Sequence, residues 1–263
     1  MTIYAIGDIH GFSAQLDRAL DLVERDGGRD ARIVFMGDYT DRGPDSRGVL
    51  DRLIGGLAEG RNWVAIKGNH DRMFERFLTQ GVENDDRIKS GLSWMNQRLG
   101  GPRTLGSYGL GGEGAAFLHS ANGGIETLMS YEVDDTVLDR EELVMQARAT
   151  VPQAHVQFLA QRPLWHREDG LLFVHAGIRP GIALDQQDED DLLWIREGWL
   201  EDTRDHGALV VHGHTALEFP EHYGNRINTD GGAGYGRDLV PVAIDEDGVF
   251  TLHPEGRAPL TAP

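Results

Sequence analysis

The sequence predicts an α/β fold, because three consecutive strand–loop–helix units make up its N-terminal part. Each unit opens with a short apolar run, and these runs lie at residues 3–6, 33–36 and 63–66. A polar loop with flanking glycines follows each run, and apolar side chains then recur at helical spacing over residues 13–25, 46–58 and 73–78. Strands that alternate with helices form βαβ units with parallel strands. Because the carboxyl ends of such strands share one edge of a sheet, the three polar loops are expected to meet there.

The composition limits both the partners and the chemistry. The chain has 263 residues, of which 40% are hydrophobic and 26% charged, as in ordinary soluble globular proteins. Its net charge of −18 repels nucleic acid and anionic membranes, so neither is expected as a partner. The chain has no cysteine, so a metal site must use His, Asp, Glu or Asn. No signal-peptide pattern and no apolar stretch of transmembrane length is found, and a cytoplasmic protein is expected.

The remainder of the chain is less regular. Periodicity weakens between residues 81 and 150, where residues 100–114 contain seven glycines. We expect an inserted, mostly helical cap over residues 81–150 on a single domain of residues 1–263. Helices are expected at 140–149 and 153–161. Further strands are expected at residues 171–174, 209–211, 226–229, 239–244 and 249–252, with a tail from Pro254 onward. The acidic run at residues 188–191 is interpreted as the solvated first turn of a helix.

The loop at residues 37–43 is the most informative stretch, because it holds two carboxylates and a guanidinium within five residues. A carboxylate at Asp38 suits a hard or borderline cation. The planar fork of Arg42 suits a phosphate group, to which it donates paired hydrogen bonds. The alternative is a solvated charged turn, since Asp-Arg-Gly-Pro is good turn chemistry.

Potential ligands at five strand ends favour the metal site over the simple turn. These ligands are Asp8, His10, Asp38, Asn69, His175, His212 and His214. All offer oxygen or nitrogen, and the nearby glycines allow sharp backbone turns around a close-packed site. The mixture suits two divalent ions with Asp38 as the bridge between them. Two metals about 3.5–4 Å apart clamp the attacking and departing oxygens of a phosphoryl displacement, and they supply the positive charge that an acidic protein needs to bind phosphate.

The motifs resemble a known family. Residues 7–11 (GDIHG), 37–43 (GDYTDRG) and 68–71 (GNHD) are similar to the three signature motifs of the phosphoprotein phosphatases, which belong to the calcineurin-like metallophosphoesterases. Residues 175–177 and 213–215 resemble the two later histidine motifs of the family. Residues 193–197 resemble the tryptophan–arginine segment of its bacterial members, and residues 122–131 resemble a loop in the same enzymes. Two positions depart from the family pattern without removing a ligand. Thr40 replaces a small aliphatic residue, and Asp71 replaces the glutamate of many members.

The resemblance implies a calcineurin-like fold, which is a two-sheet β-sandwich flanked by helices. It also implies two divalent metal ions, with manganese expected and iron or zinc as alternatives. The first metal would be held by Asp8, His10 and Asp38. The second would be held by Asp38, Asn69, His175 and His214. His212 is expected to support His214 instead of binding a metal.

The resemblance further implies the catalytic roles. Arg42 and Arg196 would hold the phosphate oxygens, and Asn69 would also contribute to the substrate site. His70 would be the general acid, oriented by Asp41, and a hydroxide bridging the metals would attack phosphorus directly. For two single residues a purely structural role stays open. Asn69 is also a good helix N-cap, and Arg196 could pair with Asp191 or Glu197 as an ordinary helix cation.

Three functions are compatible with these residues. The sequence favours a serine/threonine protein phosphatase that acts on a phosphorylated protein or peptide. The alternative is a hydrolase of dinucleoside polyphosphates such as diadenosine tetraphosphate, which should add basic and aromatic residues for the nucleobase and the extra phosphates. Arginines in the expected cap are scattered without forming a dense patch, namely Arg87, Arg98 and Arg103. A non-catalytic phosphopeptide-binding module is disfavoured, because the motifs keep Asp38, Asn69, His70 and Arg42.

Overall fold

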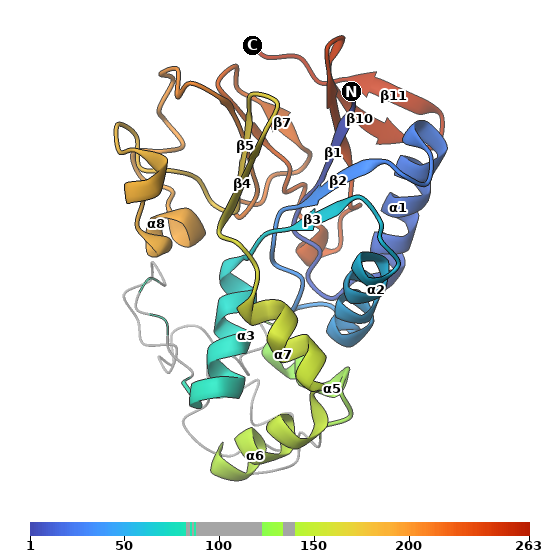
Figure 1. The fold of residues 1–263 in the computed structure, drawn as a ribbon, viewed down its shortest axis with the longest axis vertical. Helices are drawn as coiled ribbons and strands as arrows, with labels where there is room; N and C mark the ends of the chain where they lie inside the picture. Colours follow the sequence, from blue (N-terminus) through green and yellow to red (C-terminus); the bar gives the residue numbers. More distant parts are fainter. Residues whose placement is uncertain (83–84, 86, 88–122, 134–139) are drawn as a thin grey trace.

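Two β-sheets pack face to face, with helices on the outside, in the computed structural model of the chain (Figure 1), which describes residues 1–82, 85, 87, 123–133 and 140–263. The first sheet has the strand order β11-β10-β9-β1-β2-β3, and the second has the order β4-β5-β6-β8-β7. The predicted α/β architecture of two sheets flanked by helices is therefore confirmed.

The first sheet is built around the N-terminal strands. Its strands are β1 (Ile3–Ile6), β2 (Arg32–Phe35), β3 (Trp63–Ala65), β9 (Val242–Asp245), β10 (Gly248–His253) and β11 (Gly256–Pro259). β1, β2 and β3 pair in parallel, so their carboxyl ends point the same way, as expected. β9 pairs antiparallel with β1 and extends the sheet towards β10 and β11.

The second sheet supplies the later histidines. Its strands are β4 (Trp165–Glu168), β5 (Leu171–Val174), β6 (Leu209–His212), β7 (Glu221–His222) and β8 (Arg226–Asn228). β5, β6 and β8 are parallel to one another, and β4 and β7 flank them in the antiparallel sense. The loops after β5 and β6 carry His175 and His214, which places both at one end of this sheet.

The helices follow the predicted units closely. They are α1 (Ser13–Gly27), α2 (Ser46–Ala58), α3 (Asn69–Gln80), α5 (Gly124–Met129), α6 (Arg140–Thr150), α7 (Gln153–Ala160) and α8 (Glu189–Trp194), with short 3₁₀ turns η2 (Leu184–Gln186) and η3 (Ala233–Tyr235). The largest apolar cluster joins side chains of α1, α2, α3 and α7 to one face of the first sheet, including Tyr4 and Phe35. This burial explains why the apolar stripes of these helices could be recognised in the sequence.

A second apolar cluster fills the space between the sheets. Alternate residues of β1 and β2 point into it, such as Ala5 and Val34, and they meet Phe173 and Val211 from the other sheet. A third cluster lies on the outer face of the second sheet, where Val174 packs with Trp199. Both faces of each sheet are therefore covered around the central strands, so the strands read as continuous apolar runs and not as alternating ones.

Several boundaries differ from the sequence expectation. β4, β7 and β11 were not expected, and the tail predicted from Pro254 onward instead contains β11, which pairs with β10. β11 has the sequence Gly-Arg-Ala-Pro, and its proline is tolerated because the strand lies at the edge of the sheet. β9 begins at Val242, three residues later than expected. The short edge strands β4, β7 and β11 carry no alternation of apolar and polar residues that would mark them, and they form by pairing with a neighbouring strand.

The expected cap lies only partly within the described residues. The parts that are described contain α5 and α6, which agrees with a mostly helical segment. Residues 88–122 and 134–139, including the glycine-rich stretch at 100–114, lie outside the described residues. The cap over residues 81–150 and the single domain over 1–263 therefore stay predictions.

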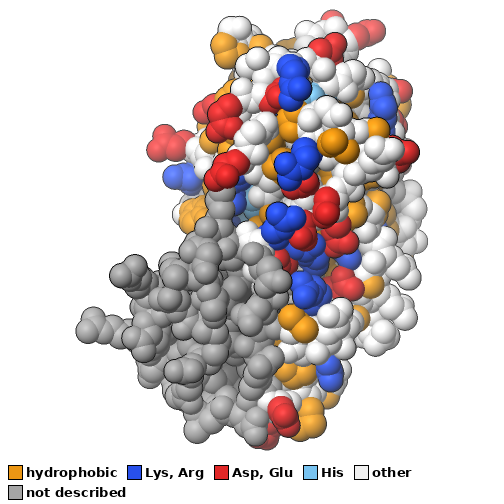
Figure 2. All heavy atoms as spheres, turned by 90° about the vertical axis from the view of Figure 1, so that its left-hand side faces the viewer, with side chains coloured by type: hydrophobic (Ala, Val, Ile, Leu, Met, Phe, Trp, Pro, Cys, Tyr) orange, Lys and Arg blue, Asp and Glu red, His pale blue; other side chains and the backbone are white. Residues whose placement is uncertain are grey.

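The acidic run starts α8 as predicted, but it is not simply solvated. Asp188 caps the helix, and Asp190 accepts hydrogen bonds from Arg72 at 2.7 Å and from Arg87 at 2.8 Å. Asp191 is buried and pairs with Arg179 at 2.6 Å. Figure 2 shows this face of the molecule, where basic and acidic side chains alternate beside the part drawn in grey. The run therefore ties α8 to α3 and holds the segment that leads to Arg196.

No helix within the described ranges is both long enough and apolar enough to cross a membrane.

Candidate metal centre

The carboxyl ends of β1, β2 and β3 meet as predicted, and backbone hydrogen bonds lock their loops together. The amide of His10 donates to the carbonyl of Asp38 at 2.8 Å, and the amide of Gly43 donates to the carbonyl of His10 at 2.8 Å. Within the described ranges, seven non-glycine residues have positive φ, and five lie at this site, namely His10, Asp38, Asp41, Arg42 and His214. Such backbone costs roughly 1–3 kcal/mol per residue and persists where the surrounding structure enforces it, which is typical of functional sites.

Asp71 organises these loops, although the only feature expected of it was its departure from the family pattern. Its buried carboxylate accepts hydrogen bonds from the amides of Asp38, Tyr39 and Gly68 at 2.8–2.9 Å. It thereby joins the loop after β2 to the start of α3. Burial, followed by the nearby Asp38 carboxylate, raises the pKa of Asp71 to about 8. An opposing cation beside Asp38 would relieve this repulsion.

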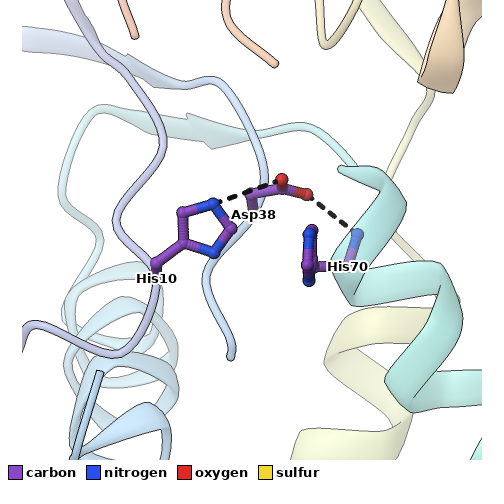
Figure 3. Close-up of side chains that lie close together, drawn as sticks. All are labelled: His10, Asp38 and His70. Carbon is purple, nitrogen blue, oxygen red and sulfur yellow. Dashed lines mark hydrogen bonds and ion pairs between the residues drawn. The ribbon is translucent and has the colours of Figure 1, made fainter. Parts of the chain in front are cut away.

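A first cluster of potential ligands consists of His10, Asp38 and His70, drawn in Figure 3. His10 Nδ1 donates to the carbonyl of Thr40 at 2.9 Å, so His10 Nε2 presents its lone pair towards Asp38 Oδ2 at 3.6 Å. The amide of His70 donates to Asp38 Oδ1 at 2.9 Å. The guanidinium of Arg42 also contacts His10 Nε2, so metal binding by this nitrogen requires Arg42 to give way.

A second cluster consists of Asp38, His175 and His214, and Asn69 lies among them. His175 Nδ1 donates to the carbonyl of Met36 at 2.8 Å, which makes His175 Nε2 an acceptor. This nitrogen nevertheless lies 2.8 Å from Asn69 Oδ1 and 3.4 Å from Asp38 Oδ1, which are acceptors too. Acceptors that converge in this way are stabilised by a cation between them. The two clusters share Asp38, as expected for a bridging ligand.

Further details support a fit to metal ions. Burial is the main cause that lowers the pKa of His10, His175 and His214, so all three imidazoles are neutral, which is the form that binds metals. His214 Nε2 is buried and has no hydrogen-bond partner within the part of the chain that the structure describes. Neutral imidazoles and carboxylates suit divalent ions of the manganese, iron and zinc type, and they do not select one.

Asp8 lies at the same site but belongs to neither cluster found among the described residues. Its carboxylate accepts the amide of His214 at 3.1 Å and 3.2 Å. Burial, followed by the charges of Asp230 and Asp38, raises the pKa of Asp8 well above its usual value. Asp8 therefore lies among other carboxylates and is hydrogen-bonded to the backbone of His214. Its role as a ligand of the first metal stays a prediction.

His70 and Asp41 form the pair that the resemblance implied. His70 Nδ1 and Asp41 Oδ2 lie 2.6 Å apart, so His70 Nε2 faces the shared site. Asp41 is held in turn by Thr127 of α5, whose hydroxyl donates to Asp41 Oδ1 at 2.8 Å and accepts from the Asp41 amide at 2.7 Å. Burial raises the pKa of Asp41, and its hydrogen bond with His70 opposes this shift. The described end of the expected cap therefore contacts Asp41, the partner of the candidate acid His70.

Both expected phosphate-binding arginines border the site. The guanidinium of Arg42 lies 3.3 Å from His70 Nε2 and stacks on the ring of Tyr235 at 4.7 Å. Arg196 Nη2 donates to the carbonyl of His214 at 3.2 Å, and no ion pair between Arg196 and Asp191 is found among the described residues. Asp191 pairs instead with Arg179.

His212 lies at the end of β6, two residues before His214, and stands apart from both ligand clusters of the described residues. β6 ends at His212, and the backbone of His214 has φ +66°, so the two-residue alternation stops between them. The ring of His212 packs edge-on against Trp199, with centroids 5.6 Å apart, and belongs to neither cluster in the described ranges.

Sequence reasoning missed three residues that contact the site. Asp71, Thr127 and Tyr235 each depend on a partner far along the chain, so no local pattern marks them. The signals available were the departure from the family pattern at Asp71 and the similarity of residues 122–131 to a bacterial loop. A third signal was the glycine-rich stretch just before Tyr235.

The model of the family "Calcineurin-like phosphoesterase" matches residues 1–240 of the chain. The asymmetrical bis(5'-nucleosyl)-tetraphosphatase of Anoxybacillus flavithermus is 25% identical over 268 residues, which covers 92% of this chain and 89% of that protein. The symmetrical bis(5'-nucleosyl)-tetraphosphatase of Methylococcus capsulatus is 46% identical over 71 residues, but this match covers only 27% of this chain and 24% of that protein.

Solved structures agree on the fold. A candidate diadenosine tetraphosphatase superposes with a TM-score of 0.59 at 20% identity, covering 95% of this chain and 92% of that one. A serine/threonine phosphatase from Saccharomyces cerevisiae superposes with a TM-score of 0.51 at 14% identity, covering 98% and 82%. Because the family model extends over most of the chain and the sheets and ligand clusters match its chemistry, the chain is a metallophosphoesterase of the calcineurin-like phosphoesterase family.

Proposed function

We propose that the protein hydrolyses dinucleoside polyphosphates of the diadenosine tetraphosphate class at the centre around Asp38. The observation that carries the chemistry is the pair of buried ligand clusters that share this carboxylate. The substrate class is supported by the full-length similarity to asymmetrical bis(5'-nucleosyl)-tetraphosphatases. Such substrates are phosphoanhydrides, so the reaction is a phosphoryl transfer to water.

The residues of the centre have separate tasks in this proposal. One metal ion would be held by Asp8, His10 and Asp38, and the other by Asp38, Asn69, His175 and His214. Divalent ions at such a site supply Lewis-acid stabilisation of the negative charge on the phosphoryl oxygens. Which ion is bound stays a prediction, with manganese expected.

The other side chains bind the phosphates and control a proton. Arg42 and Arg196 offer charged donors to the phosphoryl oxygens, which gives the acidic protein a locally positive site. Asp41 holds His70 through its Nδ1, so that Nε2 faces the site and can carry a proton to the departing oxygen. Thr127 in turn fixes Asp41, which keeps this geometry in place before substrate binds.

The choice of substrate reverses the preference drawn from the sequence. Serine/threonine phosphatase activity was favoured because the arginines of the expected cap form no dense patch. That argument does not decide the matter, because Arg98 and Arg103 lie outside the described residues and Arg87 is bonded to Asp190. The relatives that align over most of the chain carry the name of the alternative activity, whereas the likeness to the yeast phosphatase concerns the fold alone.

The test compares substrates on one preparation. The protein, loaded with manganese, should have a kcat/KM for diadenosine tetraphosphate at least about tenfold above that for a phosphoserine peptide, a difference of roughly 1.4 kcal/mol in transition-state stabilisation. Product analysis then separates the two modes of cleavage, because symmetrical attack gives two ADP molecules and asymmetrical attack gives ATP and AMP. A higher kcat/KM for the phosphopeptide would restore the protein phosphatase. Absence of turnover on both substrates, with phosphopeptide still bound, would favour the non-catalytic binding module.

A further inference from the structure

Tyr235 is an exposed aromatic side chain at the edge of the metal centre. It is 63% exposed, whereas the aromatic residues of the core are buried. The guanidinium of Arg42 lies 4.7 Å from the centroid of its ring and covers one face. Large apolar surface left in water beside a polar site is typical of a ligand contact.

The turn that presents Tyr235 is built to lie close to the centre. A Cβ atom at Gly234 would lie 2.5 Å from His10 Cδ2 and 2.8 Å from Arg42 Nη1, so only glycine allows η3 to approach these two side chains. Gly232 and Gly236, on either side of η3, both have φ above +80°, a conformation that side chains disfavour.

Hydrogen bonds to the backbone and to Asp230 hold the same turn in place. The amide of Gly232 donates to Asp230 Oδ1 at 2.9 Å, and the amide of Tyr235 donates to the carbonyl of Gly232 at 2.9 Å. Arg237 donates to the carbonyl of Leu217 at 2.9 Å. Tyr235 is therefore held on a short, bonded turn, and little conformational entropy is lost when a ligand packs against its ring.

Tyr235 also lies near the second arginine of the site. Burial lowers the pKa of Arg196, and Tyr235 is the largest of the influences that oppose this shift. The ring thus stacks on one of the two guanidinium groups that would hold phosphate, and the other lies close enough to be influenced by it. A ligand that places phosphoryl groups on Arg42 and Arg196 brings whatever is attached to the phosphates towards this ring.

We propose that Tyr235 is a specificity-determining residue that stacks on a nucleobase of the substrate. This assignment rests on the proposed function and adds the group that recognises the nucleoside. A base and a phenol ring both offer flat π-faces, and their stacking does not depend on which base is present. Tyr235 should therefore favour nucleotides over phosphates without a base, while discriminating little between adenine and guanine.

The test uses two ligands that differ only in the base, AMP and ribose 5-phosphate, measured by calorimetry on the manganese-loaded protein. Stacking of one base contributes roughly 1–3 kcal/mol, so AMP should bind about 5- to 150-fold more tightly than ribose 5-phosphate. Tyr235→Ala should bring this ratio close to one by weakening AMP alone. Tyr235→Phe keeps the ring and should keep most of the ratio.

Phe219→Ala is the matched control. Phe219 is also an exposed aromatic residue, but among the described residues its ring stacks on His253, 5.9 Å away, and not on Arg42 or Arg196. The AMP to ribose 5-phosphate ratio should not change in this variant. An unchanged ratio in Tyr235→Ala, or an equal loss of affinity for both ligands, would overturn the assignment.

Turnover separates this inference from the proposed function. If the wild-type protein does not hydrolyse diadenosine tetraphosphate, the proposed function fails. If it does, Tyr235→Ala should raise KM for this substrate about 5- to 150-fold with a smaller change in kcat, while inhibition by inorganic phosphate stays as in the wild type. A wild-type KM in Tyr235→Ala, with normal turnover, would remove Tyr235 from the substrate site and leave the proposed function intact.

Discussion

The two ends of strand β1 hold charged residues in opposite ways. At the carboxyl end, Asp8 lies buried beside other carboxylates, and burial raises its pKa. At the amino end, Arg257 donates to Asp26 at 2.7 Å and to Asp245 at 2.7 Å, and Tyr4 donates to Asp26 at 2.6 Å. The carboxylates at this end are partly accessible to solvent and are paired with a cation of the chain.

The contrast separates charges that stabilise the fold from charges that serve a ligand. Hydrogen bonds from Arg257 are the main cause that lowers the pKa of Asp26 and of Asp245, so their ionised forms stabilise the folded state. At the other end, burial and mutual repulsion work against the ionised carboxylates, and the loops there adopt strained backbone. Unbalanced negative charge of this kind is stabilised by a bound cation.

The largest expected effect is that of Asp38→Asn, which removes the carboxylate shared by both clusters. Metal analysis should show loss of both ions, and hydrolysis should fall by more than about 100-fold, since changes next to metal ligands already cost about 10–100-fold. Asp26→Asn makes the same change at the far end of β1 and should keep both metals. Loss of a single ion from Asp38→Asn would show that this residue does not bridge the two sites.

His70→Asn should have a large effect that depends on the leaving group. A serine alkoxide needs a proton as it departs, and general acid catalysis contributes about 10²–10⁴-fold. A departing nucleotide is a phosphate with a pKa near 6 and needs little such help. The kcat for a phosphoserine peptide should therefore fall much more than the kcat for diadenosine tetraphosphate, at equal metal occupancy. Equal losses on both substrates would mean that His70 binds phosphate or acts on the nucleophile.

Asp71→Ala should have an intermediate effect, because it leaves three backbone amides of the site without their acceptor. Metal affinity, followed by titration, should fall about 10–100-fold. The free energy of unfolding of the metal-loaded protein should fall by about 2–4 kcal/mol. Asp71→Glu keeps the carboxylate and should recover most of both losses. Wild-type metal affinity in Asp71→Ala would show that the loops hold their geometry without this residue.

Arg257→Gln should have the smallest effect and should leave metals and activity unchanged. The pair with Asp26 and Asp245 is partly exposed, so its loss should lower the free energy of unfolding by only about 1–2 kcal/mol. For a domain of this size, each kcal/mol lowers Tm by about 2–4 °C.

The same variant tests the sign of the pH dependence. Asp26 and Asp245 have folded pKa values below their unfolded values near 4, so their contribution is present above about pH 4. It is lost as pH falls through the lowered folded values. Arg257→Gln should therefore lower Tm at pH 7 and converge with the wild type at strongly acidic pH. A constant difference in Tm at all pH values would mean that the pair does not act through these carboxylates.

The sequence by itself determined the strands and loops that bring the ligands together. The runs at β1, β2 and β3 are apolar because they are buried on both faces, and each is followed by a glycine-flanked polar loop, so strand ends and ligands could be predicted from local pattern. The convergence of Asp38 and Asn69 then followed from the parallel arrangement, whereas His175 reaches them from the second sheet. The edge strand β11 could not be predicted, because only its pairing with β10 makes it a strand.

Only the tertiary structure decided how the site is held and what surrounds it. Asp71, Thr127 and Tyr235 act through partners 33 to 193 positions away, and such pairings leave no periodic trace in the sequence. The sequence likewise did not show that His212 packs against Trp199, or that the backbone turn at His214 breaks the alternation of the strand. Local patterns record which side chains are buried, whereas the contacts between distant loops are fixed only when the sheets close on each other.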